Sequence, residues 1–246
     1  MAASDRSFPS VWARPRRKER SSLTREQIVT QAIQLLDTEG SDALSMRRLA
    51  ARLEAGATSL YWHVANRDEL IELVIDEVYG ELEVPDPDNP DDAADWRAAT
   101  RRFAHSMRAT TVRHPWLVSV LDHLVAAYLG PNLTRGTEQM LGLFEAAGFA
   151  LAEAERALNT LSAYVLGMAI SEAAWHSWLA RHGQTPEDWA ANAMRVADEA
   201  TDGYERLRQV VALYEGADPL KAVDEDFDYG LDRVLDGLQA RLDQPG

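Results

Sequence analysis

The chain of 246 residues contains no cysteine and no long apolar run. Without cysteine it can form no disulfide bond, no thiolate metal site and no cysteine nucleophile. No apolar run approaches the ~20 residues that a membrane-spanning helix requires. Residues 1–22 are polar and basic, with no apolar stretch behind them, so we expect no signal peptide. These absences predict a soluble cytoplasmic protein that makes no membrane contact.

Motifs for catalysis and metal binding are absent as well. The chain has no G-x-S-x-G, no phosphate-binding loop and no H-E-x-x-H. Its six histidines form no pair four residues apart on a helix and no cluster with metal-ligand spacing. We therefore expect no catalytic residue, no metal site and no cofactor. An enzyme is the weakest of the functional hypotheses.

The charge of the chain is unevenly distributed. The net charge is −15, which by itself argues against nucleic-acid binding. Residues 1–67, however, hold 11 Lys and Arg against 7 Asp and Glu, and residues 68–246 hold 14 against 33. The basic end can neutralise phosphates while the acidic end stays away from a duplex. Residues 1–22 are either an arm that touches phosphate or a solvated tail, and the sequence favours neither.

Strand patterns are missing, and every periodic segment is helical, which predicts an all-α fold. Near the N-terminus, Thr24 and Gln27 form a capping box that begins a first helix, and Gly40 ends it. Ser45 caps a second helix, and a turn follows at residues 54–57. A third, short helix is expected from about Thr58 to Val64. This order is typical of a three-helix helix–turn–helix unit.

The short third helix carries two aromatic residues and a histidine that a core would not require. Tyr61 and Trp62 precede His63, and Asn66 caps the next helix with Glu69 as its box partner. Such side chains suit a helix pressed against the sugar–phosphate wall of a DNA groove. A helical hairpin with ordinary surface residues is the alternative, and spacing alone favours DNA by roughly two to one.

Basic and polar residues stand where the unit would meet DNA. Arg47 and Arg48 lie near the start of the second helix, where they can reach phosphate or a guanine edge. Thr58 and Ser59 stand at the N-terminus of the third helix, where free backbone N–H groups favour phosphate. Arg67 lies at the start of the fourth helix.

The second half of the chain follows a segment rich in Pro and Asp. Helices are expected over residues 96–114, 116–129, 132–147 and 152–182, and Thr185 with Pro186 begins another. We expect the apolar segment 116–129 to be a central helix. The last helix carries a stripe that includes Phe227, Leu231 and Leu235. Its aromatic and methionine residues either fill a core or line a pocket between helices.

Two strings of residues resemble the TetR family of transcriptional regulators. They are Leu44-Ser45-Met46-Arg47-Arg48-Leu49-Ala50 and Leu60-Tyr61-Trp62-His63-Val64-Ala65-Asn66-Arg67. The segment Phe227–Gly237 resembles the last helix of the family's ligand-binding domain. One departure is that Leu53 is followed by Glu54, where the family often has glycine.

The resemblance implies a homodimer with two recognition helices on a palindromic, double-stranded DNA operator, released by a small-molecule effector. By position, Arg47 becomes a base or phosphate contact, and the recognition helix starts with Ala57, Thr58 and Ser59. Groove and backbone contacts are implied for Tyr61, Trp62, His63 and Arg67. A regulator without an effector, acting as an activator or an architectural protein, remains open.

The resemblance also favours an effector pocket, with Phe103, Met107, Met140, Tyr164 and Met168 as its expected lining, although core packing explains each equally well. The helix at 152–182 and the last helix are expected to form the dimer interface as a four-helix bundle. The predicted division of the chain is a disordered basic arm (1–22), a DNA-binding domain (23–82), a linker (83–95) and a ligand-binding and dimerisation domain (96–246).

Overall fold

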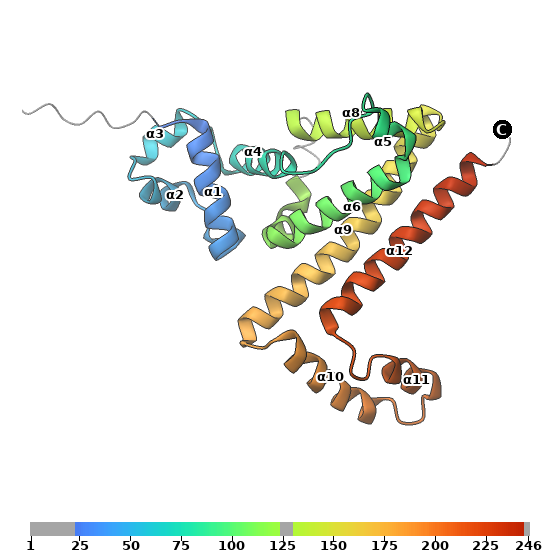
Figure 1. Cartoon of the computed structure of the whole chain (residues 1–246). Coiled ribbons are helices and arrows are strands. Elements are labelled where there is room, and N and C mark those ends of the chain that lie inside the picture. The colour runs from blue at the N-terminus through green and yellow to red at the C-terminus, as the bar shows by residue number, and fades with distance from the viewer. Residues whose placement is uncertain (1–22, 124–129, 244–246) are drawn as a thin grey trace, which may run out of the picture.

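The computed structural model describes residues 23–123 and 130–243, and this part of the chain contains helices and no strand (Figure 1). The expected all-α fold is confirmed. The predicted basic arm, residues 1–22, lies outside the described residues. No helix in the described ranges is both long enough and apolar enough to cross a membrane.

The N-terminal unit consists of α1 (Arg25–Glu39), α2 (Met46–Arg52), α3 (Ala57–Tyr61) and α4 (Arg67–Tyr79), with a 3₁₀ turn, η2 (Ser41–Ala43), before α2. The capping box at Thr24 is present, since its hydroxyl accepts from Gln27 N and the Gln27 side chain accepts from Thr24 N. Ser45 caps α2 as predicted. Asn66 caps α4, but Glu69 reaches back to Ala65 N rather than to Asn66.

The turn between α2 and α3 places a glutamate in a glycine-type conformation. Glu54 has φ of 49°, the only positive φ among the described non-glycine residues. Its N–H donates to Ala51 O, and Ala55 N donates to Ala50 O. These two bonds form a Schellman ending, which usually has glycine at the position of Glu54. The departure from the family pattern therefore coincides with a strained backbone.

The third helix is shorter than predicted. It spans Ala57–Tyr61, whereas the sequence indicated a helix from about Thr58 to Val64. The chain leaves the helix after Trp62, and both His63 N and Val64 N donate to Leu60 O. Leu60 and Val64 are both buried. Their apolar spacing extended the predicted helix to Val64, whereas the chain here forms a turn that folds back onto the core.

The predicted linker contains a helix of its own, α5 (Pro90–Ala94), which packs against α6 and α8. Asp92 in α5 is buried, forms an ion pair with Arg102 and accepts from Asp86 N. The Pro- and Asp-rich composition therefore produces a folded connection with its own polar contacts.

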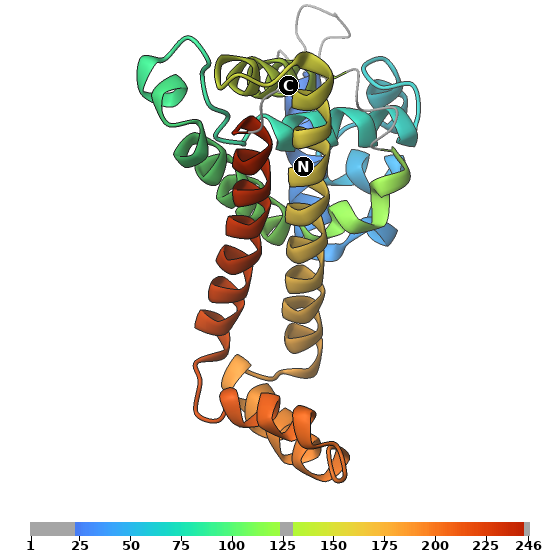
Figure 2. The ribbon, with the colours of Figure 1, turned by 90° about the vertical axis from the view of Figure 1, so that its right-hand side faces the viewer.

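The C-terminal unit is built on α6 (Trp96–Arg113), α8 (Pro131–Ala146), α9 (Leu151–His182) and α12 (Pro219–Leu242). The long helices α9 and α12 run side by side (Figure 2). Phe144, Phe227 and Leu231 are fully buried between these elements. The first three helices lie close to their predicted ranges, and α12 contains the predicted stripe but begins eight residues before Phe227.

The prediction of a central helix at 116–129 is wrong for the first half of that segment. Residues Pro115–His123 form 3₁₀ turns, η3, with a break at Val120 (φ −126°, ψ 20°). Trp116, Leu117 and Val120 pack against the core of the N-terminal unit instead of the centre of the C-terminal one. The segment has apolar residues on most sides because it lies in the contact between the two units. Residues 124–129 lie outside the described part.

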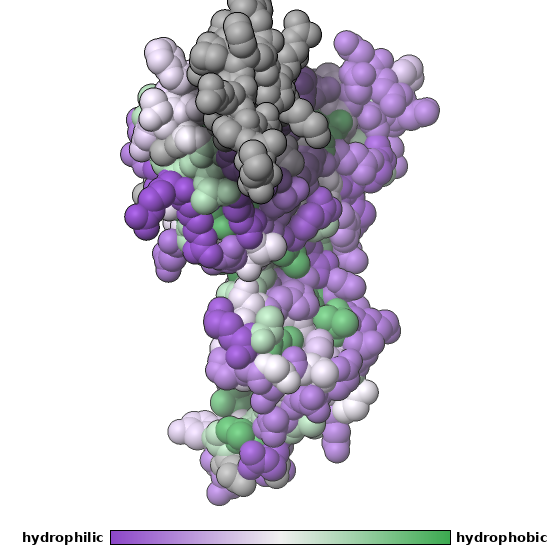
Figure 3. Space-filling view, turned by 90° about the vertical axis from the view of Figure 1, so that its left-hand side faces the viewer, coloured by the Kyte–Doolittle hydropathy of each residue, from purple (hydrophilic) through white to green (hydrophobic). Residues whose placement is uncertain are grey.

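The ends of α9 and α12 are joined by a projecting arm made of α10 (Pro186–Ala200) and α11 (Glu205–Leu213) (Figures 1 and 2). Thr185 caps α10 through Asp188 N, as predicted. Residues Glu205–Leu213 bury no side chain. Green patches break the hydrophilic surface toward this lower end (Figure 3). The exposed apolar residues of the arm include Val196, Leu207, Val210 and Leu213.

Candidate functional site

Helix α3 presents aromatic side chains to the outside although the rest of its unit buries its apolar residues. Tyr61 is 53% exposed and Trp62 is 84% exposed, whereas Leu60, between them and the core, is fully buried. Exposing a tryptophan to this extent forgoes the stabilisation that its burial would provide. The two rings are therefore available to a partner surface.

The three arginines of α2 differ in their ion pairing. Arg47 is exposed and has no ion pair among the described residues. Arg48 is exposed too, but it pairs with Glu39, which also binds Arg52 at 2.8 Å. Glu39 thus holds two guanidinium groups on the side of α1. Arg47 is the arginine of α2 that can bind an outside anion without first breaking an ion pair.

The remaining predicted contacts surround these residues. Thr58 and Ser59 are exposed on α3, and His63 is half-buried. Ala57 begins α3. Arg67 is partly buried because its guanidinium donates to Leu44 O (3.3 Å) and Ser41 O (3.4 Å). Arg67 therefore fixes α4 to the loop before α2, with three of its five N–H donors left for another partner.

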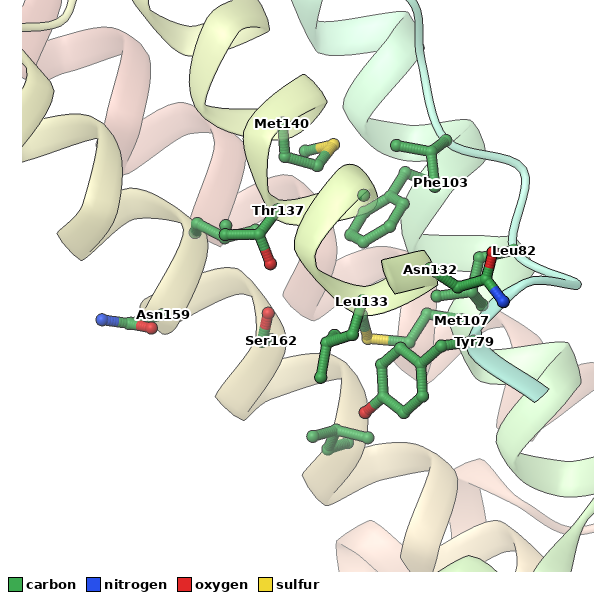
Figure 4. Close-up of a pocket in the computed structure, with 14 residues that line it drawn as sticks. Tyr79, Leu82, Phe103, Met107, Asn132, Leu133, Thr137, Met140, Asn159 and Ser162 are labelled. Atoms are coloured by element: carbon green, nitrogen blue, oxygen red, sulfur yellow. The ribbon is translucent and has the colours of Figure 1, made fainter. Parts of the chain in front are cut away.

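A cavity of about 200 Å³ lies between α4, α6, α8 and α9 (Figure 4). Phe103, Met107 and Met140 line it, and all three come from the lining that the sequence predicted. The other lining residues are mainly apolar: Leu82, Val84, Leu133, Leu158 and Leu166. Its lining matches an apolar ligand site between helices, although its volume is below the roughly 300–1,000 Å³ of sites for drug-sized ligands.

Two predicted lining residues lie elsewhere. The Tyr164 phenol donates to Phe227 O at 2.7 Å, so its ring packs against α12 on another face of α9. Met168 lines a different cavity, at the lower end of α9. Residue type and the family resemblance led to both predictions, and neither indicates which face of α9 a side chain occupies. On α9, the face that Leu158, Ser162 and Leu166 share is the one that meets the cavity.

The sequence analysis missed Tyr79, Leu133 and Thr137 as lining residues. Tyr79 was overlooked because it belongs to α4, the last helix of the predicted DNA-binding domain. Its place at the C-terminal end of α4, four residues after the buried Ile75, was the signal that could have revealed it. The cavity therefore lies at the contact between the two units.

Charged groups are absent from the lining of this cavity. The Thr137 and Ser162 hydroxyls project from facing helices and point toward one another (Figure 4). Burial raises the pKa of the Tyr79 phenol above its ordinary value, so the phenol stays neutral. Among the described residues, no Asp, Glu, Lys, Arg or His lines the cavity. The site consequently offers hydroxyl groups and the amides of Asn132 and Asn159 in an otherwise apolar, uncharged surrounding.

A buried aspartate of α4 holds the N-terminus of the cavity helix α8. Asp76 Oδ1 accepts from Asn132 N (2.9 Å) and Leu133 N (3.0 Å), and the Asn132 side chain donates back to Asp76. A carboxylate at a helix N-terminus satisfies its free N–H groups. Gly130 permits this approach, since a Cβ there would collide with the Asp76 carboxylate. Helix α4 is thereby fixed to a wall of the cavity.

A second polar contact joins α1 to the end of α6. Asp37 Oδ1 accepts from Trp116 Nε1 at 2.7 Å and lies 2.7 Å from His114 Nδ1. The other ring nitrogen of His114 lies 3.3 Å from a Glu81 carboxylate oxygen. His114 is 3% exposed. The two units are therefore tied at this point by buried hydrogen bonds as well as by the packing of η3.

Both units match models of known protein families. Residues 28–74 match the model of bacterial regulatory proteins of the tetR family, and residues 87–242 match the tetracyclin repressor-like C-terminal domain. The chain belongs to the TetR family. It is 35% identical over 234 residues, 94% of this chain and 83% of the relative, to the HTH-type transcriptional repressor DrrR1 of Streptomyces coeruleorubidus.

A second relative and a solved structure are also similar to this chain. A transcriptional regulator of Saccharopolyspora erythraea is 38% identical over 168 residues, 68% of this chain and 69% of the relative. The crystal structure of the TetR family protein ActR of Streptomyces coelicolor, in complex with actinorhodin, superposes with a TM-score of 0.74 at 30% identity. That match covers 91% of this chain and 99% of ActR. This TetR-family chain is thus a DNA-binding, ligand-responsive transcriptional regulator.

Proposed function

We propose that this regulator is a homodimeric repressor whose exposed α3 residues bind a palindromic operator, and which a neutral, mainly apolar effector releases. The observation that carries the DNA contact is the exposure of Tyr61 and Trp62 beside the free guanidinium of Arg47. A phenol hydroxyl and an arginine are both suited to phosphate and base-edge contacts. Thr58, Ser59 and His63 would complete this surface, and Ala57 would face the DNA at the start of α3.

The proposed effector site is the cavity that contains Phe103, Met107 and Met140. Because its lining lacks ionisable groups other than the neutral Tyr79, a charged ligand would lose its hydration without gaining an ion pair. The effector would therefore be neutral, with a hydroxyl or carbonyl group for Thr137 or Ser162. The cavity also favours this function over that of a regulator without an effector.

The proposed route from effector to DNA runs through α4. Tyr79 lines the cavity, Asp76 holds α8, and Arg67 at the other end of α4 holds the loop before α2. An effector that binds better when α8 has moved would favour a second arrangement of α4. In the dimer, operator affinity requires two recognition helices about one turn of DNA apart, roughly 34–36 Å.

The proposed dimer forms through α9 and α12. Among the described residues, both helices carry exposed apolar or aromatic side chains, including Leu151 (55% exposed) and Tyr229 (66% exposed, with the Arg233 guanidinium over its ring). A Cβ added at Gly167 or Gly237 would meet nothing within 4 Å. Small residues on outer faces allow a second helix pair to approach closely, as in a four-helix bundle.

Selection of bound DNA from a random pool, followed by sequencing, tests the proposal. An enriched inverted repeat with half-sites about 10–10.5 base pairs apart supports a dimeric reader. The enriched site then serves to screen matched neutral and charged compounds for release of the DNA. Absence of enrichment from a folded dimer would refute the DNA contact, and release by charged compounds alone would refute the assignment of the effector class.

A further inference from the structure

A second cavity, about 540 Å³, lies between the lower parts of α9 and α12. Helix α10 closes one side of it, and the residues after α11 close another. Its volume lies within the roughly 300–1,000 Å³ of sites for drug-sized ligands. No residue lines both this cavity and the one beside α8.

Aromatic rings form the walls of this cavity. Trp175 of α9 and Trp189 of α10 meet edge to face, with ring centroids 5.6 Å apart and an interplanar angle of 71°. Tyr214 stands beside them, and Ala190, Ala193 and Ala197 leave a flat surface on α10. Two perpendicular indoles next to a flat wall leave a slot that suits a planar ring system.

One polar group in these walls lacks a partner. The indole N–H of Trp175 is buried and has no hydrogen-bond partner in the described structure. Buried N–H groups in proteins are nearly always paired, because an unpaired donor loses its hydrogen bond to water. An acceptor atom on a ligand, carried in addition to its positive charge, would provide that partner; the preference for a cation rests on the aromatic faces and on Asp226 and not on this N–H.

The charge around the cavity is negative. Glu172 and Asp226 belong to the lining, which contains no Lys or Arg. Arg108 of α6 holds Glu172 in place through a 2.6 Å bond from Nε and also binds Asp224 at 2.7 Å. Glu172 and Asp224 thus share one guanidinium, which leaves Asp226 as the unpaired carboxylate of the lining. The exposed carboxylate of Asp226 has no ion pair among the described residues.

We propose that this cavity is a second ligand site, which takes a planar aromatic cation. Faces of tryptophan and tyrosine attract a positive charge, and the unpaired carboxylate of Asp226 adds to the attraction. The ligand therefore differs in charge from the neutral effector of the cavity beside α8. The regulator accordingly accepts two chemical classes at two places.

The test uses the full-length dimer and a matched pair of fluorescent probes. 9-Aminoacridine is a planar cation at slightly alkaline pH, and acridine is its neutral counterpart of nearly the same shape. Binding is measured by fluorescence titration and by calorimetry, in the absence of DNA because both probes intercalate. We expect the cation to bind at least about fivefold more tightly than the neutral probe.

Variants locate the bound probe. Trp189→Leu and Asp226→Asn should each weaken binding of 9-aminoacridine about fivefold or more. Trp178→Leu is the matched control, because Trp178 is as exposed as Trp189 (37%) but lies outside the cavity. Circular dichroism confirms that each variant remains folded. Retained binding in Trp178→Leu together with loss in the other two supports the site.

Three results would overturn the proposal. The first is equal binding of the neutral and cationic probes, or binding of neither. The second is loss of binding only in Thr137→Phe, which fills the cavity beside α8 and would place the probe there. The third is dissociation of the dimer by Trp189→Leu in sedimentation, with no probe bound to the unchanged protein, which would assign the slot to a second copy of the chain.

Discussion

The contact of Asp37 with the end of α6 offers a strong test of how the two units are held together. Asp37→Ala removes the acceptor of two buried donors, Trp116 Nε1 and His114 Nδ1, each 2.7 Å from the same carboxylate oxygen. A buried donor left without a partner costs about 1–3 kcal/mol, so two would cost about 2–6 kcal/mol. The Asp37 side chain is 30% exposed, and water can therefore replace part of the loss. We expect the variant to be about 3 kcal/mol less stable.

The assay is guanidinium unfolding followed by circular dichroism at one fixed dimer concentration, because the stability of a dimer depends on concentration. Asp37→Asn keeps an oxygen acceptor in the same place and should lose less stability than Asp37→Ala. Asp42→Ala is the control: Asp42 is exposed, has no hydrogen bond to another residue in the described structure, and its loss should change stability by less than about 0.5 kcal/mol.

A double-mutant cycle with Trp116→Phe separates the indole bond from general effects. Phenylalanine keeps an aromatic ring in the pocket but lacks the N–H. If the hydrogen bond stabilises the fold, the stability lost in the double mutant should differ by about 1 kcal/mol from the sum of the losses in Asp37→Ala and Trp116→Phe. Additive losses, or a loss in Asp37→Ala no larger than in Asp42→Ala, would refute the reasoning.

Three further predictions follow from local geometry. Glu54→Gly should raise the free energy of unfolding by about 0.5–1 kcal/mol relative to Glu54→Ala, because the residue has a positive φ; equal urea midpoints for the two variants would contradict this. Gly130→Ala should cost about 2–3 kcal/mol, because the new Cβ displaces the Asp76 carboxylate from α8; calorimetry with Gly136→Ala as control measures it. Arg47→Ala and Tyr61→Phe should weaken operator binding without loss of thermal stability. Arg47→Ala should also reduce by about one the slope of the logarithm of the binding constant against the logarithm of the salt concentration. An unchanged slope would remove Arg47 from the phosphate contacts.

Much of the fold follows from local signals in the sequence. Capping residues such as Thr24, Ser45 and Thr185 place helix starts correctly, because a cap involves only neighbouring backbone groups. The prediction failed at η3 for the opposite reason. The apolar residues of η3 contact a core formed by a distant part of the chain, and the periodicity of a segment does not indicate such a contact. The same holds for Glu54, whose conformation is imposed by the packing of α2 and α3.

The cavity could be predicted only in part for a related reason. Residue type predicts that Phe103, Met107 and Met140 are apolar and inward, but the face of α9 that meets the cavity is decided by the packing of α8 and α12. Tyr164 and Met168 do not line this cavity because they lie on α9 faces that those contacts direct elsewhere, and Met168 lines the second cavity. The DNA contacts proposed for α3 remain predictions.

The uncharged lining of the cavity beside α8 has a consequence for how a cell would use this regulator. A molecule that leaves water for such a cavity without an ion pair can also leave water for the hydrocarbon of a lipid bilayer, because both transfers penalise charge and favour apolar surface. Such a compound permeates the membrane without a carrier. Its concentration at the regulator then follows its concentration outside the cell, and the response reports exposure rather than uptake.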